Sequence, residues 1–238
     1  MSLLDIIGPV MVGPSSSHTA GACRVALLAR HALALAPKRA KLELHGSFAK
    51  TGRGHGTHLA LVAGLLGCYP DDPRIPRALE EAEANGLEVA FEERDLGDVH
   101  PNTVRITLEA AGEPGGGETA APERVSVTGS SLGAGLVRIV KVNGYDSNFS
   151  GSYHTLLIEH EDRPGVIARA ARVLADDEVN IATIYSARQR RGGSALMSVE
   201  MDRRPARYAL EYLAHLPYIR WSRTLPEVMS GGAQHDPV

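Results

Sequence analysis

Apolar residues recur at helical spacing in the first 90 residues of the chain. Between residues 19 and 36, Val25, Leu28 and Ala32 fall on one face, so we predict a helix that Pro37 ends. Similar spacing predicts two further helices, each followed by a glycine that suits a C-terminal cap. These two helices are expected over residues 58–67 and 75–85.

Alternation of apolar and polar residues marks the rest of the first 150 positions. Leu42 and Leu44 alternate with Glu43 and His45, which predicts a strand over residues 41–49. Helices interleaved with strands indicate an α+β domain with a mostly antiparallel sheet. The glycine-rich run at 110–123 separates two alternating segments, and we interpret it as a hairpin loop within this domain. The further strands are expected at 87–93, 103–109, 124–130 and 136–142.

A different pattern begins after the polar stretch at residues 148–153. Strand, helix, strand, strand, helix and strand follow in turn, which is the βαββαβ order of a ferredoxin-like fold. Its first helix is predicted to take Asp162 as N-cap and Pro164 in the first turn. These elements are expected at 153–162, 163–178, 180–189, 195–202, 205–216 and 218–225. We therefore predict domains at 1–148 and 153–225, with a flexible tail at 226–238.

Composition and charge narrow the functional class. Hydrophobic residues make up 43% of the chain and charged residues 22%, as in ordinary soluble globular proteins. The net charge of -3 argues against a nucleic-acid-binding face as the main function. The apolar run at 59–69 is too short to span a bilayer, and the N-terminus carries no basic run, so we expect a cytoplasmic protein. The two cysteines, Cys23 and Cys68, lack metal-ligand spacing and are predicted to be buried structural thiols.

The segment GPSSSHTAGA, residues 13–22, concentrates hydroxyls around one imidazole. Hydroxyl groups can hold a carboxylate, and an imidazole titrates near neutral pH and can relay a proton. The segment could be a flexible tail, a helix cap or part of a site that handles a polar substrate. Its candidate residues are Ser15, Ser16, Ser17, His18 and Thr19.

A second polar segment is HGSFAKTGRGHGTHLA, residues 45–60. Its glycines alternate with Arg53, His55 and Thr57 ahead of a predicted helix, so backbone N–H groups can approach an anion. The spacing matches neither a P-loop nor a dinucleotide-binding turn. His55 and His58 are three residues apart and could share a helix face, either as metal ligands or as solvated side chains.

Two short segments complete the set. VHPNT, residues 99–103, places His100 and Asn102 before a predicted strand, and GSSLGAG, residues 129–135, forms a glycine-rich bend around Ser131. Each alone is compatible with an ordinary turn, bulge or hairpin.

In this order, and followed by the βαββαβ domain, these segments resemble the β subunit of bacterial iron–sulfur-dependent L-serine dehydratases. The resemblance covers essentially the whole chain, and GPSSSHT and TGRGHGT are its most specific parts. It implies conversion of L-serine to pyruvate and ammonia with a [4Fe–4S] cluster in place of pyridoxal phosphate. It also implies that the first domain is related to the allosteric substrate-binding domain of some phosphoglycerate dehydrogenases.

The resemblance assigns roles to this chain's residues. His18 and His55 are the expected catalytic groups, although the residues do not say which is the base, or whether the base belongs to a partner. A cluster needs about three cysteine ligands, so the resemblance places it on a separate α subunit, where an open iron acts as Lewis acid. The family loop usually carries Asp where this chain has His58. The expected substrate-binding residues are Ser15, Ser16, Ser17, Thr19, Thr51, Thr57, His100, Asn102 and Ser131.

The second domain resembles the ACT family, whose members bind small effectors or pair as dimers. The backbone N–H groups at the start of its first helix suit a carboxylate, but the same turn also makes an ordinary helix cap. We expect homodimerisation through the ACT domain, the first domain or both. Two other functions stay open, a regulatory amino-acid sensor and a metal hydrolase built on His18, His55 and His58. The matching effector residues are Asp162, Arg163, Pro164, Gly165 and Asn180.

Overall fold

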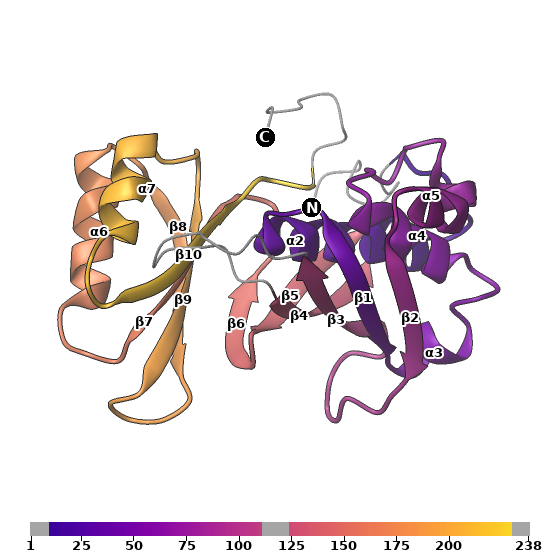
Figure 1. The fold of residues 1–238 in the computed structure, drawn as a ribbon, viewed down its shortest axis with the longest axis horizontal. Helices are drawn as coiled ribbons and strands as arrows, with labels where there is room; N and C mark the ends of the chain where they lie inside the picture. Colours follow the sequence, from indigo (N-terminus) through magenta and orange to yellow (C-terminus); the bar gives the residue numbers. More distant parts are fainter. Residues whose placement is uncertain (1–9, 111–123, 230–238) are drawn as a thin grey trace.

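The computed structural model describes residues 10–110 and 124–229 and shows two α+β units side by side (Figure 1). The first unit is built on a six-stranded sheet, in which β1 and β2 pair in parallel and the other neighbours pair antiparallel. The prediction of a mostly antiparallel α+β domain is therefore confirmed. The strands follow the order β2 (Glu88–Glu93), β1 (Pro37–Leu44), β3 (Thr103–Ala110), β4 (Arg124–Gly133), β5 (Leu136–Val142) and β6 (Tyr145–Phe149).

Two predictions about this sheet have different outcomes. Glu109 of β3 pairs with Arg124 of β4, so the glycine-rich run joins a hairpin as predicted, and residues 111–123 lie outside the described part. The alternation that we followed stopped at residue 142, and it missed β6. Tyr145, Ser147 and Phe149 point inward there, and the small polar Ser147 hides the apolar repeat.

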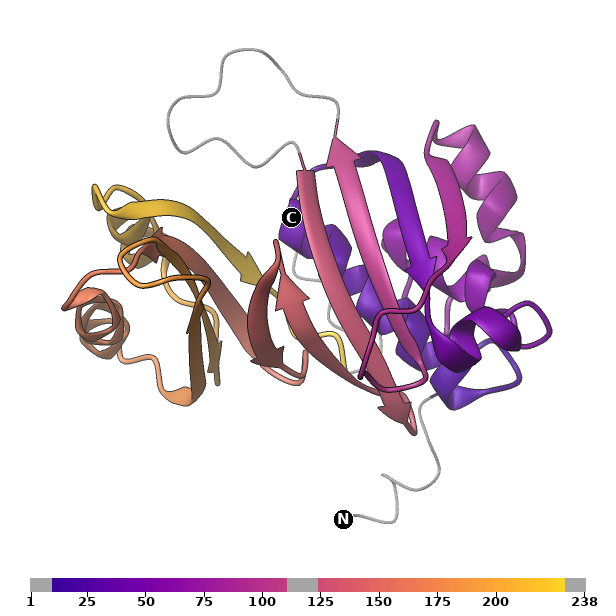
Figure 2. The ribbon, with the colours of Figure 1, turned by 90° about the horizontal axis from the view of Figure 1, so that it is seen from below.

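The helices of the first unit cover one face of the sheet, and the other face carries none of them (Figures 1 and 2). The predicted first helix is divided, because a π-helical turn precedes the α-helix, which ends at Leu33 rather than at residue 36. The strand predicted over 41–49 ends at Leu44, where Gly46 turns the chain with φ of 54° into a short helix. The helical elements are η1 (Ser16–Gly21), α2 (Ala22–Leu33), α3 (Gly46–Lys50), α4 (Thr57–Leu65), η2 (Ile75–Arg77) and α5 (Ala78–Ala84).

Both cysteines lie in the core between α2 and α4. The Sγ of Cys23 donates to the carbonyl oxygen of Cys68 at 3.1 Å, and both residues are buried and unbridged. Burial raises the pKa of both thiols, that of Cys68 to about 11, so both are protonated at neutral pH. The prediction of buried structural thiols is confirmed.

The second unit has the predicted ferredoxin-like order, with α6 and α7 on its outer face (Figure 1). Its first helix is not capped by Asp162, because Gly165 is the N-cap, with φ of 88° and no side-chain bond. The Asp162 carboxylate instead accepts from the Gly192 N–H at 2.8 Å and from Arg188 at 3.0 Å. Its sheet follows the order β10 (Ile219–Leu225), β7 (His154–Glu161), β9 (Ser194–Met201) and β8 (Ile181–Arg188), with α6 (Val166–Asp176) and α7 (Arg207–Ala214).

The two units meet in a packed joint. Glu200 of β9 is buried, and its carboxylate accepts from the Ser150 N–H at 2.8 Å, from the Ser150 hydroxyl at 2.7 Å and from Thr183 at 2.8 Å. Leu157, Leu196, Trp221, Leu225 and Val228 belong to the same buried core as the helices of the first unit.

The chain that follows β10 is part of this joint. Val228 is fully buried and donates its N–H to the Gly151 carbonyl. Arg24 of α2 donates to the carbonyl oxygens of Gly135 at 2.8 Å and Met229 at 2.9 Å. The predicted flexible tail is therefore wrong for residues 226–229, and residues 230–238 lie outside the described part. No helix in the described part is long and apolar enough to cross a membrane.

Candidate functional site

The polar segments singled out in the sequence meet at one end of the six-stranded sheet. Ser47 donates its N–H to the Pro101 carbonyl at 2.8 Å, and Ser131 donates its N–H to the Asn102 carbonyl at 2.9 Å. A Cβ at Gly21 would lie 2.0 Å from the Ser131 hydroxyl oxygen, so η1 and β4 are in close contact there. Segments that are more than 100 residues apart in sequence thus form one polar region.

His18 lies at the centre of this region, in the π-helical turn η1. Ser15 caps the turn by accepting from the His18 N–H at 3.3 Å, and its hydroxyl also lies 3.5 Å from His18 Nδ1. On the other side of the ring, Nε2 lies 3.3 Å from the Ser47 hydroxyl and 3.2 Å from the Thr51 hydroxyl. The His18 side chain is therefore held in one orientation by hydroxyls on both ring nitrogens.

The environment of His18 favours its neutral form. The residue is only 9% exposed, and this burial, followed by the nearby His55, lowers the pKa of its imidazole from the usual value of 6.5. An imidazole that is neutral at physiological pH can accept a proton. His18 is thus held as a neutral imidazole between the hydroxyls of Ser15, Ser47 and Thr51.

His55 is the exposed partner of His18. Their ring centroids are 4.8 Å apart, and His55 Nδ1 lies 2.9 Å from the Thr51 carbonyl oxygen. Because a carbonyl can only accept, Nδ1 of neutral His55 carries the hydrogen and Nε2 is an acceptor. Thr51 therefore contacts both imidazoles, one through its side chain and the other through its backbone.

Other predicted residues are held inside the chain. Thr19, Thr57 and Ser131 are each at most 1% exposed. Their hydroxyl oxygens have no hydrogen-bond partner among the described residues. By contrast, Ser16 and Ser17 are partly exposed on η1.

His100 and Asn102 shape the turn that precedes β3. The exposed His100 accepts the Asn102 N–H on its Nδ1 at 3.1 Å. The Asn102 carbonyl in turn accepts from Ser131. These bonds hold the turn against β4, and no contact of either side chain with His18 or His55 is found in the described chain.

Sequence reasoning missed two residues that contact His18. The Ser47 hydroxyl contacts both His18 and, at 3.1 Å, the Thr51 hydroxyl, and the Phe48 ring meets the His18 ring edge-on at 5.4 Å. Ser47 and Thr51 are four residues apart, which is the spacing of neighbours on a helix surface. That spacing was the available signal.

The expectation that His55 and His58 share a helix face is wrong. The His58 ring lies 4.5 Å from the ring of Phe91 on β2, whereas His55 lies against His18. His58 Nδ1 is buried without a partner among the described residues. Among the described residues, no group of three or more His, Cys, Asp or Glu side chains is placed to hold a metal ion.

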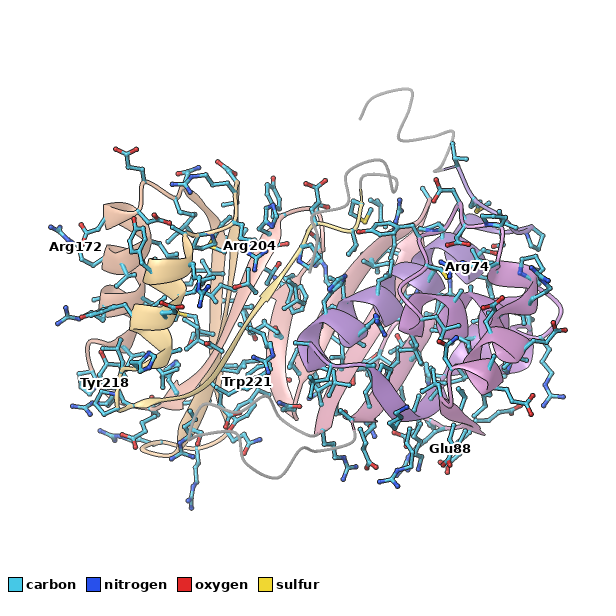
Figure 3. The ribbon with its side chains drawn as sticks, turned by 45° about the horizontal axis from the view of Figure 1, so that its top comes forward. Arg74, Glu88, Arg172, Arg204, Tyr218 and Trp221 are labelled. Atoms are coloured by element: carbon cyan, nitrogen blue, oxygen red, sulfur yellow. The ribbon has the colours of Figure 1, made fainter. Side chains whose placement is uncertain are left out.

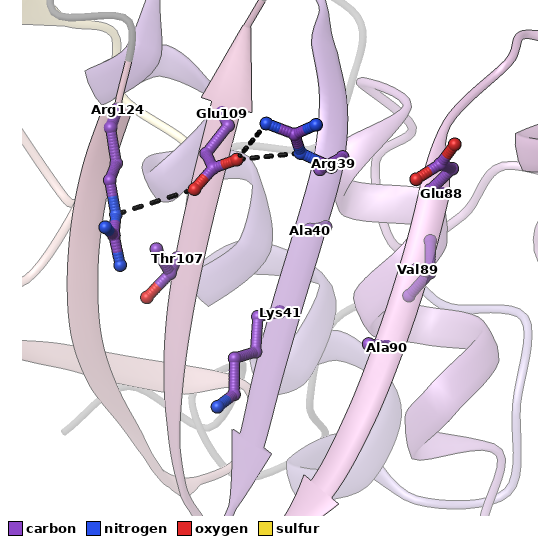
Figure 4. Close-up of a pocket in the computed structure, with 9 residues that line it drawn as sticks. All are labelled: Arg39, Ala40, Lys41, Glu88, Val89, Ala90, Thr107, Glu109 and Arg124. Carbon is purple, nitrogen blue, oxygen red and sulfur yellow. Dashed lines mark hydrogen bonds and ion pairs between the residues drawn. The ribbon is translucent and has the colours of Figure 1, made fainter.

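A cavity lies on the helix-free face of the sheet (Figure 4). It has a volume of about 460 Å³, and Glu109 at its edge accepts from Arg39 at 2.8 Å and pairs with Arg124 at 3.8 Å. Its lining residues include no histidine and none of the polar segments singled out in the sequence. The imidazole pair is therefore the better candidate for a reacting site.

Comparison with known proteins places these segments in a family. The family model described as "Serine dehydratase beta chain" matches residues 2–96, and the chain is 41% identical to a probable L-serine dehydratase β chain of Bacillus subtilis. That match covers 92% of this chain and 94% of the relative. The chain belongs to the serine dehydratase β-chain family. The L-serine dehydratase β chain of Peptoniphilus asaccharolyticus is 40% identical, over 85% of this chain and 87% of that one.

The serine dehydratase β-chain family membership confirms the resemblance stated from the motifs. A model described as "ACT domain" matches residues 154–211, which confirms the family of the second domain. An L-serine dehydratase of Mycobacterium bovis is 35% identical, but that match covers 48% of this β chain and 29% of the relative.

The predicted effector residues of the ACT domain do not converge within one chain. Asp162 pairs with Arg188 at the end of β8, whereas Asn180 precedes the start of β8 and donates to Asp202 at 2.7 Å. The eight residues of β8 separate the two positions by roughly 25 Å at the usual rise of a strand. Effector binding by these residues stays a prediction.

Proposed function

We propose that this chain is one half of a two-chain L-serine dehydratase, which converts L-serine to pyruvate and ammonia. In that reaction serine loses its α-proton and its hydroxyl as water, and hydrolysis of the resulting enamine then releases ammonia. The observation that carries the proposal is the neutral, hydroxyl-clamped His18 beside His55, in the segment that matches the family model.

Each contact of the imidazole pair suits one part of this chemistry. His18, held by Ser15, Ser47 and Thr51, accepts the α-proton of bound serine. The hydroxyls of η1 hold the substrate carboxylate. His55, exposed and with Nε2 as an acceptor, exchanges the proton with solvent or with a partner chain.

The second half of the active site is proposed to come from an α chain. The resemblance implies a [4Fe–4S] cluster, but Cys23 and Cys68 do not fit it, because both thiols are buried and protonated in the core. We therefore assign the cluster to the α chain. In support, most of the length of the Mycobacterium bovis relative has no counterpart in this chain.

Self-association is proposed through the ACT sheet. Its edge strand β8 is exposed along most of its length, and Ile184 and Tyr185 are 43% and 37% exposed. An apolar edge strand of this kind favours pairing with a second copy of the chain. Sedimentation at micromolar concentration tests this, and a strictly monomeric species would overturn it.

The main experiment joins the two chains. The β chain alone should be colourless and inactive, and co-expression with the α chain followed by oxygen-free reconstitution should give turnover of L-serine. In that complex, His18→Ala should lower kcat roughly a hundredfold or more. Lys50→Ala is the matched control, because it alters α3 next to Thr51 through an exposed side chain.

The ACT domain favours one other function, that of a regulatory amino-acid sensor. The same experiment separates the two. If His18→Ala assembles normally and keeps full turnover while activation by amino acids changes, the chain is regulatory and the catalytic proposal fails.

A further inference from the structure

The two hydroxyls beside His18 Nε2 also bond to each other and to the backbone of α3. Ser47 lies in α3, and Thr51 is the C-cap of that helix. The Thr51 hydroxyl donates to the Ser47 carbonyl at 2.9 Å. A threonine hydroxyl has one hydrogen and two lone pairs. Because the Ser47 carbonyl takes that hydrogen, the Thr51 oxygen can only accept from His18 Nε2, 3.2 Å away, and from the Ser47 hydroxyl, 3.1 Å away.

The Ser47 hydroxyl has two possible acceptors, Thr51 Oγ1 at 3.1 Å and His18 Nε2 at 3.3 Å. If it donates to Thr51, both hydroxyl oxygens present lone pairs to Nε2, and Nε2 carries the ring hydrogen. If it donates to Nε2, a lone pair of the ring faces a lone pair of Thr51 at 3.2 Å, and the two repel. The first arrangement is therefore the more stable one.

The backbone carbonyl of Ser47 supports the same position of the hydrogen. Burial and the nearby His55 lower the pKa of His18, whereas a hydrogen bond to the Ser47 carbonyl opposes them. A carbonyl can only accept, so a ring N–H is directed toward Ser47. The Ser47 hydroxyl contacts Nε2 rather than Nδ1, which places the hydrogen on the Nε2 side of the ring.

The opposite ring nitrogen, Nδ1, is left with a lone pair that faces Ser15. The Ser15 oxygen accepts from the His18 backbone N–H at 3.3 Å, so the Ser15 hydroxyl hydrogen is free to point at Nδ1. The distance from Ser15 Oγ to Nδ1 is 3.5 Å, longer than either contact on the Nε2 side. A hydrogen bond of this length is weak, so a substrate can replace it.

We propose that Ser47 and Thr51 are positioning residues that fix His18 as the Nε2–H tautomer, so that proton transfer at His18 takes place at Nδ1. The proton-transfer role rests on the proposed dehydratase function, whereas the tautomer does not. The α-proton of serine passes to Nδ1, the C–H electron pair stays with the substrate, and the ring becomes an imidazolium. Its Nε2–H remains bonded to Thr51, whose own hydrogen is held by a carbonyl that takes up no proton. The proton therefore leaves from Nδ1 as well.

The tautomer is measured without turnover, by nitrogen NMR on the full β chain containing ¹⁵N-labelled histidine. His18→Gln identifies the His18 signals through their loss. Above neutral pH, the shifts of the two ring nitrogens and their couplings to the ring protons should place the hydrogen on Nε2 and the lone pair on Nδ1. A hydrogen on Nδ1 in the wild-type chain overturns the proposal, whatever the variants do.

Substitutions of the two hydroxyls test the positioning role. In the double variant Ser47→Ala with Thr51→Val, the Nε2–H should exchange with water about tenfold faster, because its hydroxyl acceptors are gone, and the Nδ1–H tautomer should appear. Thr51→Ser keeps the hydroxyl and should keep the wild-type spectrum. Arg172→Ala is the control, since that arginine is exposed on α6 of the second unit (Figure 3). Unchanged exchange and an unchanged tautomer in the folded double variant would overturn the positioning role.

The assembled enzyme tests the link to proton transfer. Thr51→Val should lower kcat with little change in KM, and Thr51→Ser should recover most of the loss. If Thr51→Val changes the tautomer but leaves kcat at the wild-type value, proton transfer at Nδ1 is overturned. If the wild-type complex does not turn over L-serine, the dehydratase proposal fails, and the NMR result on the tautomer still stands.

Discussion

The imidazoles of His18 and His55 lie 4.8 Å apart and both bond to Thr51, His18 through the threonine hydroxyl and His55 through its carbonyl. Two protonated rings at this separation repel each other. The charge state of His55 therefore adjusts the basicity of His18, which connects an exposed side chain to a buried one.

This coupling predicts the pH dependence of the assembled enzyme. If neutral His18 is the base, kcat/KM should persist below pH 6.5 and fall as the pH drops through the lowered pKa of His18. His55→Asn removes the neighbouring charge, so the pKa of His18 should rise and the acidic limb should move to higher pH. The pH profile of kcat/KM measures this shift, and a limb that is the same in both proteins would contradict the coupling.

Because Gly21 lies so close to Ser131, a second substitution at Ser131 should restore the stability that is lost when Gly21 is replaced. Gly21→Ala places a methyl group 2.0 Å from the Ser131 hydroxyl oxygen and should cost about 1–3 kcal/mol of unfolding free energy. Adding Ser131→Gly removes the clashing atoms and should restore much of that loss. Urea unfolding of the two single variants and the double variant checks the prediction, and strictly additive losses would refute it.

Glu200 predicts a weak point of the joint. Its carboxylate accepts three hydrogen bonds from Ser150 and Thr183, so Glu200→Ala leaves buried donors unpaired and should cost about 3 kcal/mol. Glu200→Gln should cost less, because its amide oxygen can still accept from Ser150 and its amide N–H can donate to the Thr183 hydroxyl. Glu88→Ala, at an exposed position on β2, serves as the control for urea unfolding. Equal unfolding midpoints for all these variants would show that Glu200 does not stabilise the contact between the two units.

Replacing His58 by aspartate, the usual family residue, should leave kcat nearly unchanged. His58→Asp loses the ring contact with Phe91, but it gains an acid in the first turn of α4 near the positive charge of Arg53. The two effects on stability oppose each other. Because His58 contacts neither His18 nor His55, kcat should stay within about twofold of the wild-type value. Loss of a positioned acid or base would instead lower kcat about a hundredfold. A drop of tenfold or more would show that the loop has been rebuilt around His58.

Local patterns were sufficient to predict much of this fold. The alternation around Leu42 and the helical spacing around Val25 placed β1 and α2, and the ACT domain followed from its element order and its motif. β6 escaped because one of its inward positions is Ser147, whose hydroxyl donates to Ser198 at 3.4 Å in the joint. Polar residues are buried there because two units meet, and a single-strand pattern contains no information about the second unit.

The site was predictable in composition but not in orientation. His18 and His55 were selected from their segments, yet Ser47 was overlooked because the residues around it were assigned to a strand. The opposite directions of His55 and His58 depend on Gly56, which takes φ of 74° directly before α4. That left-handed turn sets the rotation of the helix relative to the loop, and residue spacing alone does not specify it.

Helix α2 begins directly after the turn that holds His18, and β10 and residues 226–229 pack against its flank. A recombination event or a designed fusion that cuts the chain at residues 148–153 would therefore uncover one flank of α2, the helix that follows the turn at His18. Leu28, which lies against Gly151 and Val228 in the intact chain, would face water. The two units, with α2 packed between them, thus behave as one evolutionary unit. An ACT domain could be exchanged between relatives only together with the surface of α2 on which it packs.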